Sequence, residues 1–359
     1  MEAVFNRAKR ACYAGLDSVT LRREVASRVA DVVPFDAHAF STCDPDTGIM
    51  SHTVAEGIPS DLARMYAEVL YPGVLAQVPM DMPKKGINVY SMAEESSPLE
   101  TILRANGVRE ETHVSIWSGG RLWGTWCLMR RGQSTRAAKK YFPFLERLTP
   151  HLARGLQSAA LIDRALVEDD PTLHESGPGV LVLDSRNTPT MRTRSVMAWL
   201  TDLRDLGLSS PDDIPLSVIG LAARVRSFPN RDAGEEHVRI RGLSGRWYVL
   251  RASLALPGVD GASSVVVVIR PALPLEVATI LTRLYGFSAR EREVIAAVAR
   301  GEPTKCIAAA LGLSPHTVTE HIDRACNKLG VRGRKALLAK LFFEGYSPKL
   351  RSAKPTIAN

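Results

Sequence analysis

Polar side chains gather in a short stretch near the carboxyl end of the chain, after Pro315. A helix has 3.6 residues per turn, so side chains spaced three or four positions apart share one face. On that basis we expect one face to present His316, Thr319, Glu320, Asp323 and Asn327. Donors and acceptors of these kinds can bind base edges in the major groove, so this face predicts direct base readout.

A second set of side chains flanks the same face and could contact the phosphate backbone. Its members are Lys305, Thr317, His321, Arg324, Lys328, Arg332 and Arg334. Phosphate contacts position a protein on DNA without selecting a sequence. Two carboxylates on the reading face, Glu320 and Asp323, would repel phosphates unless they accept hydrogen bonds from cytosine amino groups.

The positive charge of the chain is concentrated in the same region. The whole chain has a net charge of +8, and residues 271–359 hold 14 Lys and Arg against 7 Asp and Glu. A basic surface confined to one part of a protein is typical of phosphate-backbone binding. A solvated, solubilising face would have the same charge, so only the sequence motif can distinguish it from a DNA-binding surface.

The residues around this helix predict how it is positioned. Ser314 is a typical N-cap, Pro315 suits a first helical turn, and Gly312 can end the preceding helix at positive φ. An apolar stripe is expected from the residues Val318, Ile322, Ala325 and Leu329. Ser288 and Glu291 form a capping box for an earlier helix. Residues 287–331 therefore predict three short helices with a tight turn, the helix-turn-helix pattern, rather than an ordinary amphipathic surface helix.

Residues 283–342 resemble the LuxR/GerE-type helix-turn-helix of bacterial transcription regulators. The matching segments are 287–294, Lys305-Cys306-Ile307-Ala308 with Cys306 in place of the usual Glu, 314–318, and Lys328-Leu329-Gly330-Val331. The resemblance implies an all-α, four-helix DNA-binding domain over residues 287–345. It also implies a dimer contact on a fourth helix, about 333–343, through Leu338, Leu341 and Phe342, although packing within the domain is an alternative role. Thr319 stands where the family commonly has Lys, so a family operator sequence cannot be carried over.

Residues 1–166 predict an α+β domain on the N-terminal side of this helix-turn-helix. We expect a helix over about 2–32, a strand pair at 37–42 and 48–55, helices near 60–71 and 98–105, and a long helix over about 137–167. A second hairpin, 111–118 with 121–130, turns at Gly119-Gly120. This order of elements is similar to a GAF domain, a common small-molecule sensor.

Trp117, Trp123 and Trp126 lie on that second hairpin. Because Trp123 and Trp126 are three positions apart, a regular strand would place them on opposite sides. The three could form an aromatic wall of a ligand pocket, and ordinary core packing is the alternative.

Residues 167–178 are typical of an acidic linker, and residues 179–271 predict a second α+β domain. Strands are expected at 179–184, 237–242, 246–256 and 263–270, with helices at 195–206 and 215–227. This order looks like a PAS domain. A connecting helix over 272–286 and a basic tail over 346–359 complete the multidomain organisation.

The sequence motifs argue against several other classes. We find no hydrolase, P-loop or zinc-protease motif and expect no enzyme, no resident metal and no cofactor. Five scattered cysteines, no long apolar run and no secretory signal indicate a cytoplasmic protein without a membrane segment.

Together these features predict a dimeric regulator that binds a double-stranded operator and responds to a small-molecule effector, with RNA polymerase as a further partner. The alternative is a constitutive DNA-binding regulator whose N-terminal domains serve only dimerisation or protein contacts.

Overall fold

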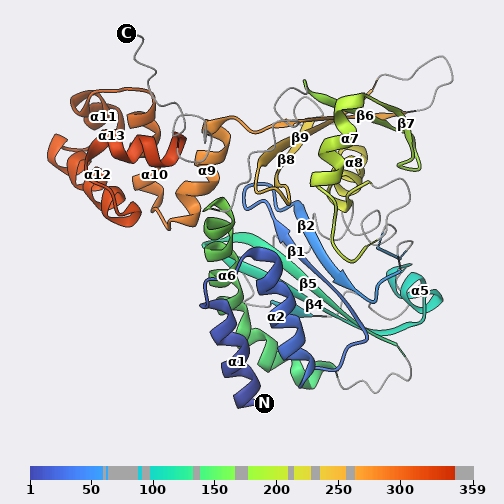
Figure 1. Ribbon diagram of the computed structural model, residues 1–359. Coiled ribbons are helices and arrows are strands. Elements are labelled where there is room, and N and C mark those ends of the chain that lie inside the picture. The colour runs from blue at the N-terminus through green and yellow to red at the C-terminus, as the bar shows by residue number, and fades with distance from the viewer. Residues whose placement is uncertain are drawn as a thin grey trace, which may run out of the picture. The chain divides into compact units, whose positions relative to one another are not determined.

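A computed structural model of the 359-residue chain describes residues 1–59, 62–63, 88–90, 98–131, 138–165, 177–208, 214–227, 235–255 and 263–343. The chain forms two compact units, Met1–Pro271 and Ala272–Asn359 (Figure 1). The first unit contains two antiparallel sheets, and the second is helical throughout its described part. Among the described residues, no helix has both the length and the apolar character needed to cross a membrane.

The first sheet has the strand order β2-β1-β5-β4-β3. Its strands are β1 (Ala37–Cys43), β2 (Met50–Glu56), β3 (Val89–Tyr90), β4 (Val108–Ser118) and β5 (Arg121–Arg131). Both predicted hairpins are confirmed, since β1 pairs with β2 and β4 with β5, each antiparallel. Gly119 and Gly120 turn the second hairpin with φ of 58° and 70°, the left-handed values that a two-residue hairpin loop requires.

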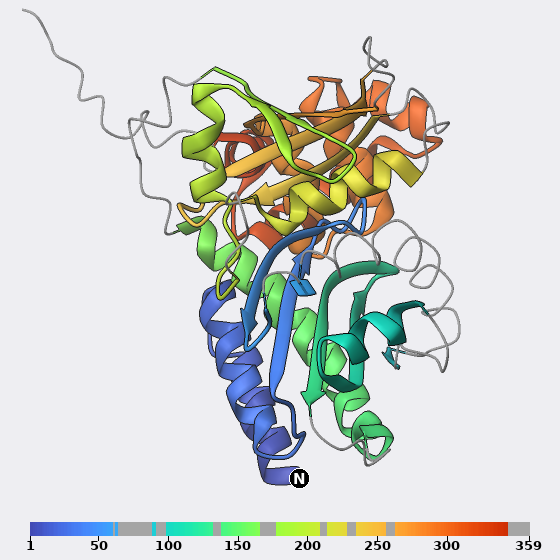
Figure 2. The ribbon, with the colours of Figure 1, turned by 90° about the vertical axis from the view of Figure 1, so that its right-hand side faces the viewer.

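Helices α1 (Glu2–Cys12), α2 (Ser18–Ala30) and α6 (Phe142–Ala165) lie on one face of this sheet (Figure 2). The expected single helix over 2–32 is wrong: Gly15 turns the chain at φ 68°, and the Asp17 carboxylate caps α2 by accepting from the amides of Val19 and Thr20 at 3.0 and 2.9 Å. Helix α5 (Pro98–Ala105) matches its prediction. The helix expected near 60–71 falls outside the described residues except for 62–63.

The second sheet has the order β7-β6-β10-β9-β8. Its elements are β6 (Gly179–Leu183), β7 (Pro189–Arg192), α7 (Arg194–Asp202), α8 (Leu216–Ser227), β8 (Glu235–Arg241), β9 (Trp247–Leu254) and β10 (Val265–Pro271). The sequence missed β7, a short and largely exposed edge strand without apolar alternation. Strand β10, expected to be buried throughout, buries only alternate side chains, so one of its faces is partly open.

The two sheets share one hydrophobic core. Helix α8 is buried on nearly all sides because it packs against β2 of the first sheet as well as β8, β9 and β10 of the second. The carboxylate of the half-buried Asp205 accepts from the amides of Thr53 at 2.7 Å and Leu216 at 2.8 Å. Next to it, Gly207 has φ 78° and lies so close to Ala55 that a Cβ would fall 1.8 Å from the Ala55 carbonyl oxygen, so only glycine fits.

A buried ion pair adds a polar contact between the sheets. The Arg239 guanidinium on β8 donates to both carboxylate oxygens of Asp44, which directly follows β1, at 2.9 and 2.7 Å. It also pairs with Asp46. Predicted as GAF-like and PAS-like domains, the two sheets thus lie within one compact unit, and the linker predicted between them falls outside the described residues except for 177–178.

The second unit consists of consecutive helices. They are α9 (Pro274–Leu284), α10 (Ala289–Ala299), α11 (Thr304–Leu311), α12 (Pro315–Leu329), α13 (Gly333–Leu338) and a π-helical turn, Ala339–Phe343. Helix α9, expected as a connector, packs against this final turn and so is part of the unit. The basic tail predicted over 346–359 lies outside the described residues.

Candidate nucleic-acid interface

Helices α11 and α12 meet in the tight turn that the sequence predicted. Gly312 ends α11 in the left-handed conformation, with φ 62° and ψ 40°. The Ser314 hydroxyl then caps α12 by accepting from the amide of Thr317 at 3.0 Å, and Pro315 occupies the first helical position. The predicted roles of Gly312, Ser314 and Pro315 are confirmed, and together they fix the residue at which α12 begins.

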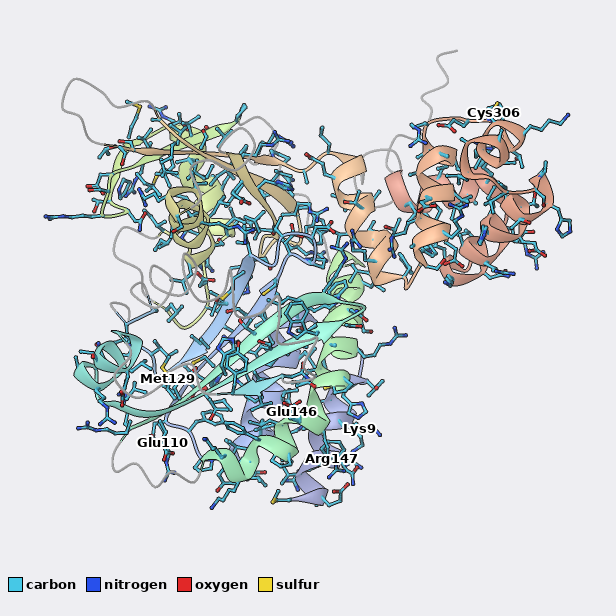
Figure 3. The ribbon with its side chains drawn as sticks, turned by 180° about the vertical axis from the view of Figure 1, so that it is seen from behind. Lys9, Glu110, Met129, Glu146, Arg147 and Cys306 are labelled. Atoms are coloured by element: carbon cyan, nitrogen blue, oxygen red, sulfur yellow. The ribbon has the colours of Figure 1, made fainter. Side chains whose placement is uncertain are left out.

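The inner side of α12 is the predicted apolar stripe. Val318, Ile322, Ala325 and Leu329 are all buried, and Cys326 is buried beside them at 4% exposure. Sequence reasoning missed Cys326, although free cysteine commonly behaves as a small buried hydrophobe. Cys306 on α11, by contrast, is exposed (Figure 3).

The outer side of α12 is the predicted reading face. All of its members are exposed: His316, Thr319, Glu320, Asp323 and Asn327. The Thr319 hydroxyl donates to the Pro315 carbonyl oxygen at 3.1 Å, which leaves its oxygen as an acceptor on this face. The helix therefore offers both donors and acceptors to a groove.

Glu320 lies between two basic side chains, His316 and Arg324. Its carboxylate is 3.7 Å from His316 Nδ1 and 3.6 Å from the Arg324 guanidinium, one turn away in each direction. The side chains of all three are well exposed, so each pairing contributes only a few tenths of a kcal/mol, about 0.2–0.5. The pairing with Arg324 nevertheless offsets part of the negative charge that would face phosphates.

The predicted phosphate contacts divide into two groups. Lys305, Arg324 and Arg332 are exposed, and Thr317 and His321 are half-buried. Lys328 and Arg334, however, bind within the unit: Lys328 Nζ is 2.6 Å from Glu291 Oε2, and Arg334 Nη2 donates to the Glu302 carbonyl oxygen at 2.6 Å. These two are better suited to hold the helices together than to contact DNA.

The Glu291 carboxylate links the ends of two helices. It accepts from the Ser288 amide at 2.7 Å, completing the predicted capping box of α10, and pairs with Lys328 near the end of α12. Lys328 also donates to the Gly286 carbonyl oxygen at 3.0 Å. Burial alone would raise the pKa of Glu291, but the hydrogen bonds from Lys328 and Ser288 hold that pKa below its usual range. The Glu291 carboxylate is therefore ionised, as its ion pair with Lys328 requires.

The residues expected at a dimer contact have different exposures. Leu338 is half-buried, whereas Leu341 is 1% exposed inside its own unit. The side chain of Phe342 lies outside the described residues. Leu341 thus packs in the core of the unit, the alternative role that the sequence left open for this helix.

The three tryptophans of the N-terminal unit lie in or beside its core. Trp126 is fully buried and stacks on Phe40 with ring centroids 5.0 Å apart, and Trp123 is 6% exposed. Trp117 is half-buried and packs against the shared core. The register of β4 and β5 shifts between Ile116 and Trp117, which leaves Trp123 without a paired residue on β4, so the placement of Trp123 and Trp126 on opposite sides stays a prediction.

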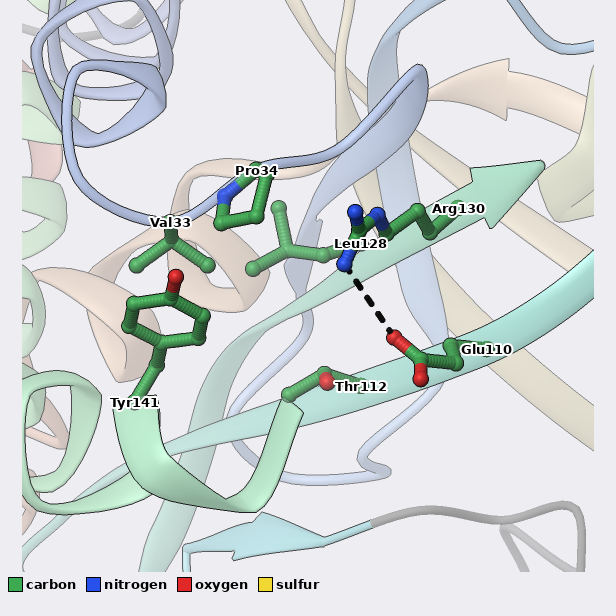
Figure 4. A pocket seen from close by; sticks show the side chains of 7 residues that line it. All are labelled: Val33, Pro34, Glu110, Thr112, Leu128, Arg130 and Tyr141. Carbon is green, nitrogen blue, oxygen red and sulfur yellow. Dashed lines mark ion pairs between the residues drawn. The ribbon is translucent and has the colours of Figure 1, made fainter. Parts of the chain in front are cut away.

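A pocket lies elsewhere in this unit (Figure 4). It is lined by Val33, Pro34, Glu110, Thr112, Leu128, Arg130 and Tyr141. An ion pair of 3.6 Å joins Glu110 and Arg130 at its wall. None of the three tryptophans lines this pocket.

The turn, the caps and the exposed polar face define the C-terminal unit as a helix-turn-helix, a class of DNA-binding domain in which the second helix of the motif enters the major groove. Residues 286–340 match the family described as "Bacterial regulatory proteins, luxR family". The spore germination protein GerE of Bacillus subtilis is 43% identical over 56 residues, which cover 16% of this chain and 76% of GerE. The chain belongs to the LuxR family of DNA-binding regulatory proteins.

Other similarities cover less or score lower. The probable transcriptional regulatory protein NarL of Mycobacterium tuberculosis is 47% identical over 53 residues, and the chain spans only 24% of NarL and matches it with 15% of its own length. The solved structure of Escherichia coli SdiA is 12% identical, with 89% of this chain and 88% of that chain covered and a TM-score of 0.30. A score this low does not establish a shared fold for the N-terminal unit.

Proposed function

We propose that the protein is a dimeric transcription regulator that binds an operator through α12 and is controlled by an effector acting on its N-terminal unit. The observation that carries the DNA-binding part is the exposed polar face of α12, held by a capped turn and bordered by exposed Lys305, Arg324 and Arg332. Phosphate contacts from these three cations would seat the helix in the major groove.

Binding to DNA should depend on salt through those cations. Removing one phosphate-binding cation reduces the steepness of log affinity against log salt by about 1. We expect this reduction for Lys305→Gln and Arg324→Gln, measured by fluorescence anisotropy with the full chain on a duplex chosen by selection from random sequence. Lys9→Gln removes an exposed charge from the N-terminal unit and is the matched control. Equal slopes for all four proteins would refute the assignment.

Control by an effector belongs to the same proposal. In this proposal, the GAF-like and PAS-like parts bind a small molecule. Its binding shifts an equilibrium between dimer arrangements that do and do not fit the operator. The half-buried Leu338 on α13 is the proposed dimer contact, together with Phe342, and RNA polymerase is the expected protein partner on the promoter.

The alternative is constitutive binding, with the N-terminal unit serving only dimerisation or protein contacts. The shared core of the two sheets favours a structural role of this kind. Mass spectrometry of the purified chain under native conditions tests which holds. A co-purified small molecule whose removal changes DNA affinity supports effector control. Unchanged affinity after removal, or with every molecule tried, supports the alternative.

A further inference from the structure

A cluster of metal-ligand types lies on the first sheet, and none of its members lines the pocket. It consists of Glu111 and His113 on β4 and Cys127 on β5, and His113 is paired directly with Cys127 across the strands. Alternation along the regular part of both strands places all three on one face. Met129, labelled in Figure 3, is on the same face, two positions beyond Cys127.

This face is opposite to the one covered by α6. A Cβ at Gly124 would lie 2.8 Å from Leu156 of α6, so the even-numbered positions of β5 around it point toward that helix. Positions 125, 127 and 129 therefore point to the other side. The cluster is thus separated from the helices α1, α2 and α6 by the sheet itself.

The three side chains are buried and close together. Glu111, His113 and Cys127 are 4%, 2% and 4% exposed, and one ligand atom from each lies within 4.8 Å of the others. Cys127 Sγ is 3.5 Å from Glu111 Oε1, and His113 Nδ1 is 3.8 Å from the same oxygen. Within the described part of the chain, neither ring nitrogen of His113 has a hydrogen-bond partner.

Ordinary packing of polar side chains in a core does not explain why both ring nitrogens of His113 lack a hydrogen-bond partner among the described residues. Leaving a buried polar group without a partner costs about 1–3 kcal/mol, so such groups are seldom kept without a reason. A neutral imidazole ring carries one N–H group and one nitrogen lone pair. A metal ion that accepts this lone pair would satisfy one of the two nitrogens.

We propose that Glu111, His113 and Cys127 bind one divalent transition-metal ion of the zinc type. Tetrahedral zinc with its usual bond lengths places a carboxylate oxygen about 3.6 Å from a thiolate sulfur and about 3.4 Å from an imidazole nitrogen. The separations of 3.5 and 3.8 Å around Glu111 Oε1 are close to this geometry. Three protein ligands leave the fourth position for water or another small ligand.

The donor set argues against other ions. A thiolate and an imidazole suit zinc and neighbouring transition metals, whereas magnesium and calcium take oxygen ligands. The site lies in the N-terminal unit and its occupancy is measured without DNA, so it goes beyond the proposed regulatory function and does not depend on it. The three ligands were missed from the sequence because their spacing, two residues and then fourteen, matches no metal motif; only the strand pairing brings them together.

Metal retention by the full chain tests the site. The purified chain is stripped with a chelator, given one equivalent of Zn²⁺, passed through a desalting column and analysed for zinc. We expect one ion retained per chain in the wild type and in Cys12→Ser, which changes a buried thiol of α1 outside the cluster. His113→Gln and Cys127→Ser should each weaken retention by more than about tenfold.

Cobalt provides a readout that does not rely on the folding of variants. Co²⁺ bound by the wild type in place of zinc should show a thiolate-to-cobalt charge-transfer band together with the absorption of a tetrahedral ion. Absence of zinc from the desalted wild type, a cobalt spectrum without the thiolate band, or full retention by folded His113→Gln would each overturn the proposal.

Discussion

Replacing Arg239 by Met should destabilise the N-terminal unit by about 3 kcal/mol. Arg239 and Asp44 are 6% and 2% exposed, and the change would remove the guanidinium that contacts both carboxylate oxygens. Breaking a buried pair from one side costs about 3–5 kcal/mol because the remaining charge is uncompensated. Asp44 would keep two backbone donors, the amides of Asp46 and Arg239 at 2.9 Å each, so we expect the lower end of that range.

The assay is equilibrium urea unfolding of the full chain, followed by tryptophan fluorescence and by circular dichroism. Trp126 on the first sheet and Trp199 on α7, beside the second sheet, are both fully buried, so fluorescence reports on both sheets. Arg23→Met removes an exposed arginine of α2 and should change stability by no more than about 0.5 kcal/mol.

A double-mutant cycle separates the ion pair from a mere loss of packing. Asp44→Asn removes the buried charge, so Arg239→Met should cost at least about 1 kcal/mol less in that background than in the wild type. Additive effects, or a loss below about 1 kcal/mol for the single change, would show that this pair does not hold the two sheets together.

Three further predictions concern the helix-turn-helix and a buried histidine. Ser314→Ala removes the cap of α12 and should lower the free energy of unfolding of the C-terminal unit by about 1 kcal/mol in thermal melts, whereas Ser314→Asp should retain most of it. Lys328→Met should lower the melting temperature of that unit but leave the salt slope of DNA binding unchanged, unlike Lys305→Gln; a reduced slope would restore Lys328 as a phosphate contact. Burial, and next the charge of Arg22, lower the pKa of His52 from 6.5 to about 3, so its contribution is complete above pH 6.5 and is lost as the pH falls toward 3. His52→Asn keeps an acceptor for Arg22 but does not titrate. Between pH 8 and pH 5, the free energy of unfolding of the wild type should therefore fall by about 2 kcal/mol more than that of this variant. Parallel curves of this free energy against pH would contradict the low pKa.

The C-terminal helices could be predicted because their determinants are local. Ser288 with Glu291, and Ser314 with Thr317, are three residues apart, and the positive φ of Gly312 depends on glycine itself. The apolar stripe of α12 repeats every three or four residues, a period that the sequence displays directly. Hairpins were predictable for the same reason, since each strand pair is adjacent in the chain.

The contacts that could not be predicted join distant residues. Asp44 and Arg239 are 195 positions apart, and Glu291 and Lys328 are 37 apart. Each of these residues looks like an ordinary charged surface residue until the fold brings its partner to it, because nothing in composition or periodicity specifies a distant partner. The shared core around α8 is hidden in the same way: its apolar residues fit a helix of a separate domain equally well.

The two cations of α12 that the sequence treated alike differ in their availability for DNA. Arg324 is 61% exposed and its pairing with exposed Glu320 is worth about 0.2–0.5 kcal/mol, so it can turn to a phosphate at little cost. Lys328 is held at 2.6 Å by the nearly buried Glu291, and its departure would leave that carboxylate without its cation and weaken the link between α10 and α12. A phosphate would have to compensate for both effects. We therefore expect a phosphate contact from Arg324 rather than from Lys328.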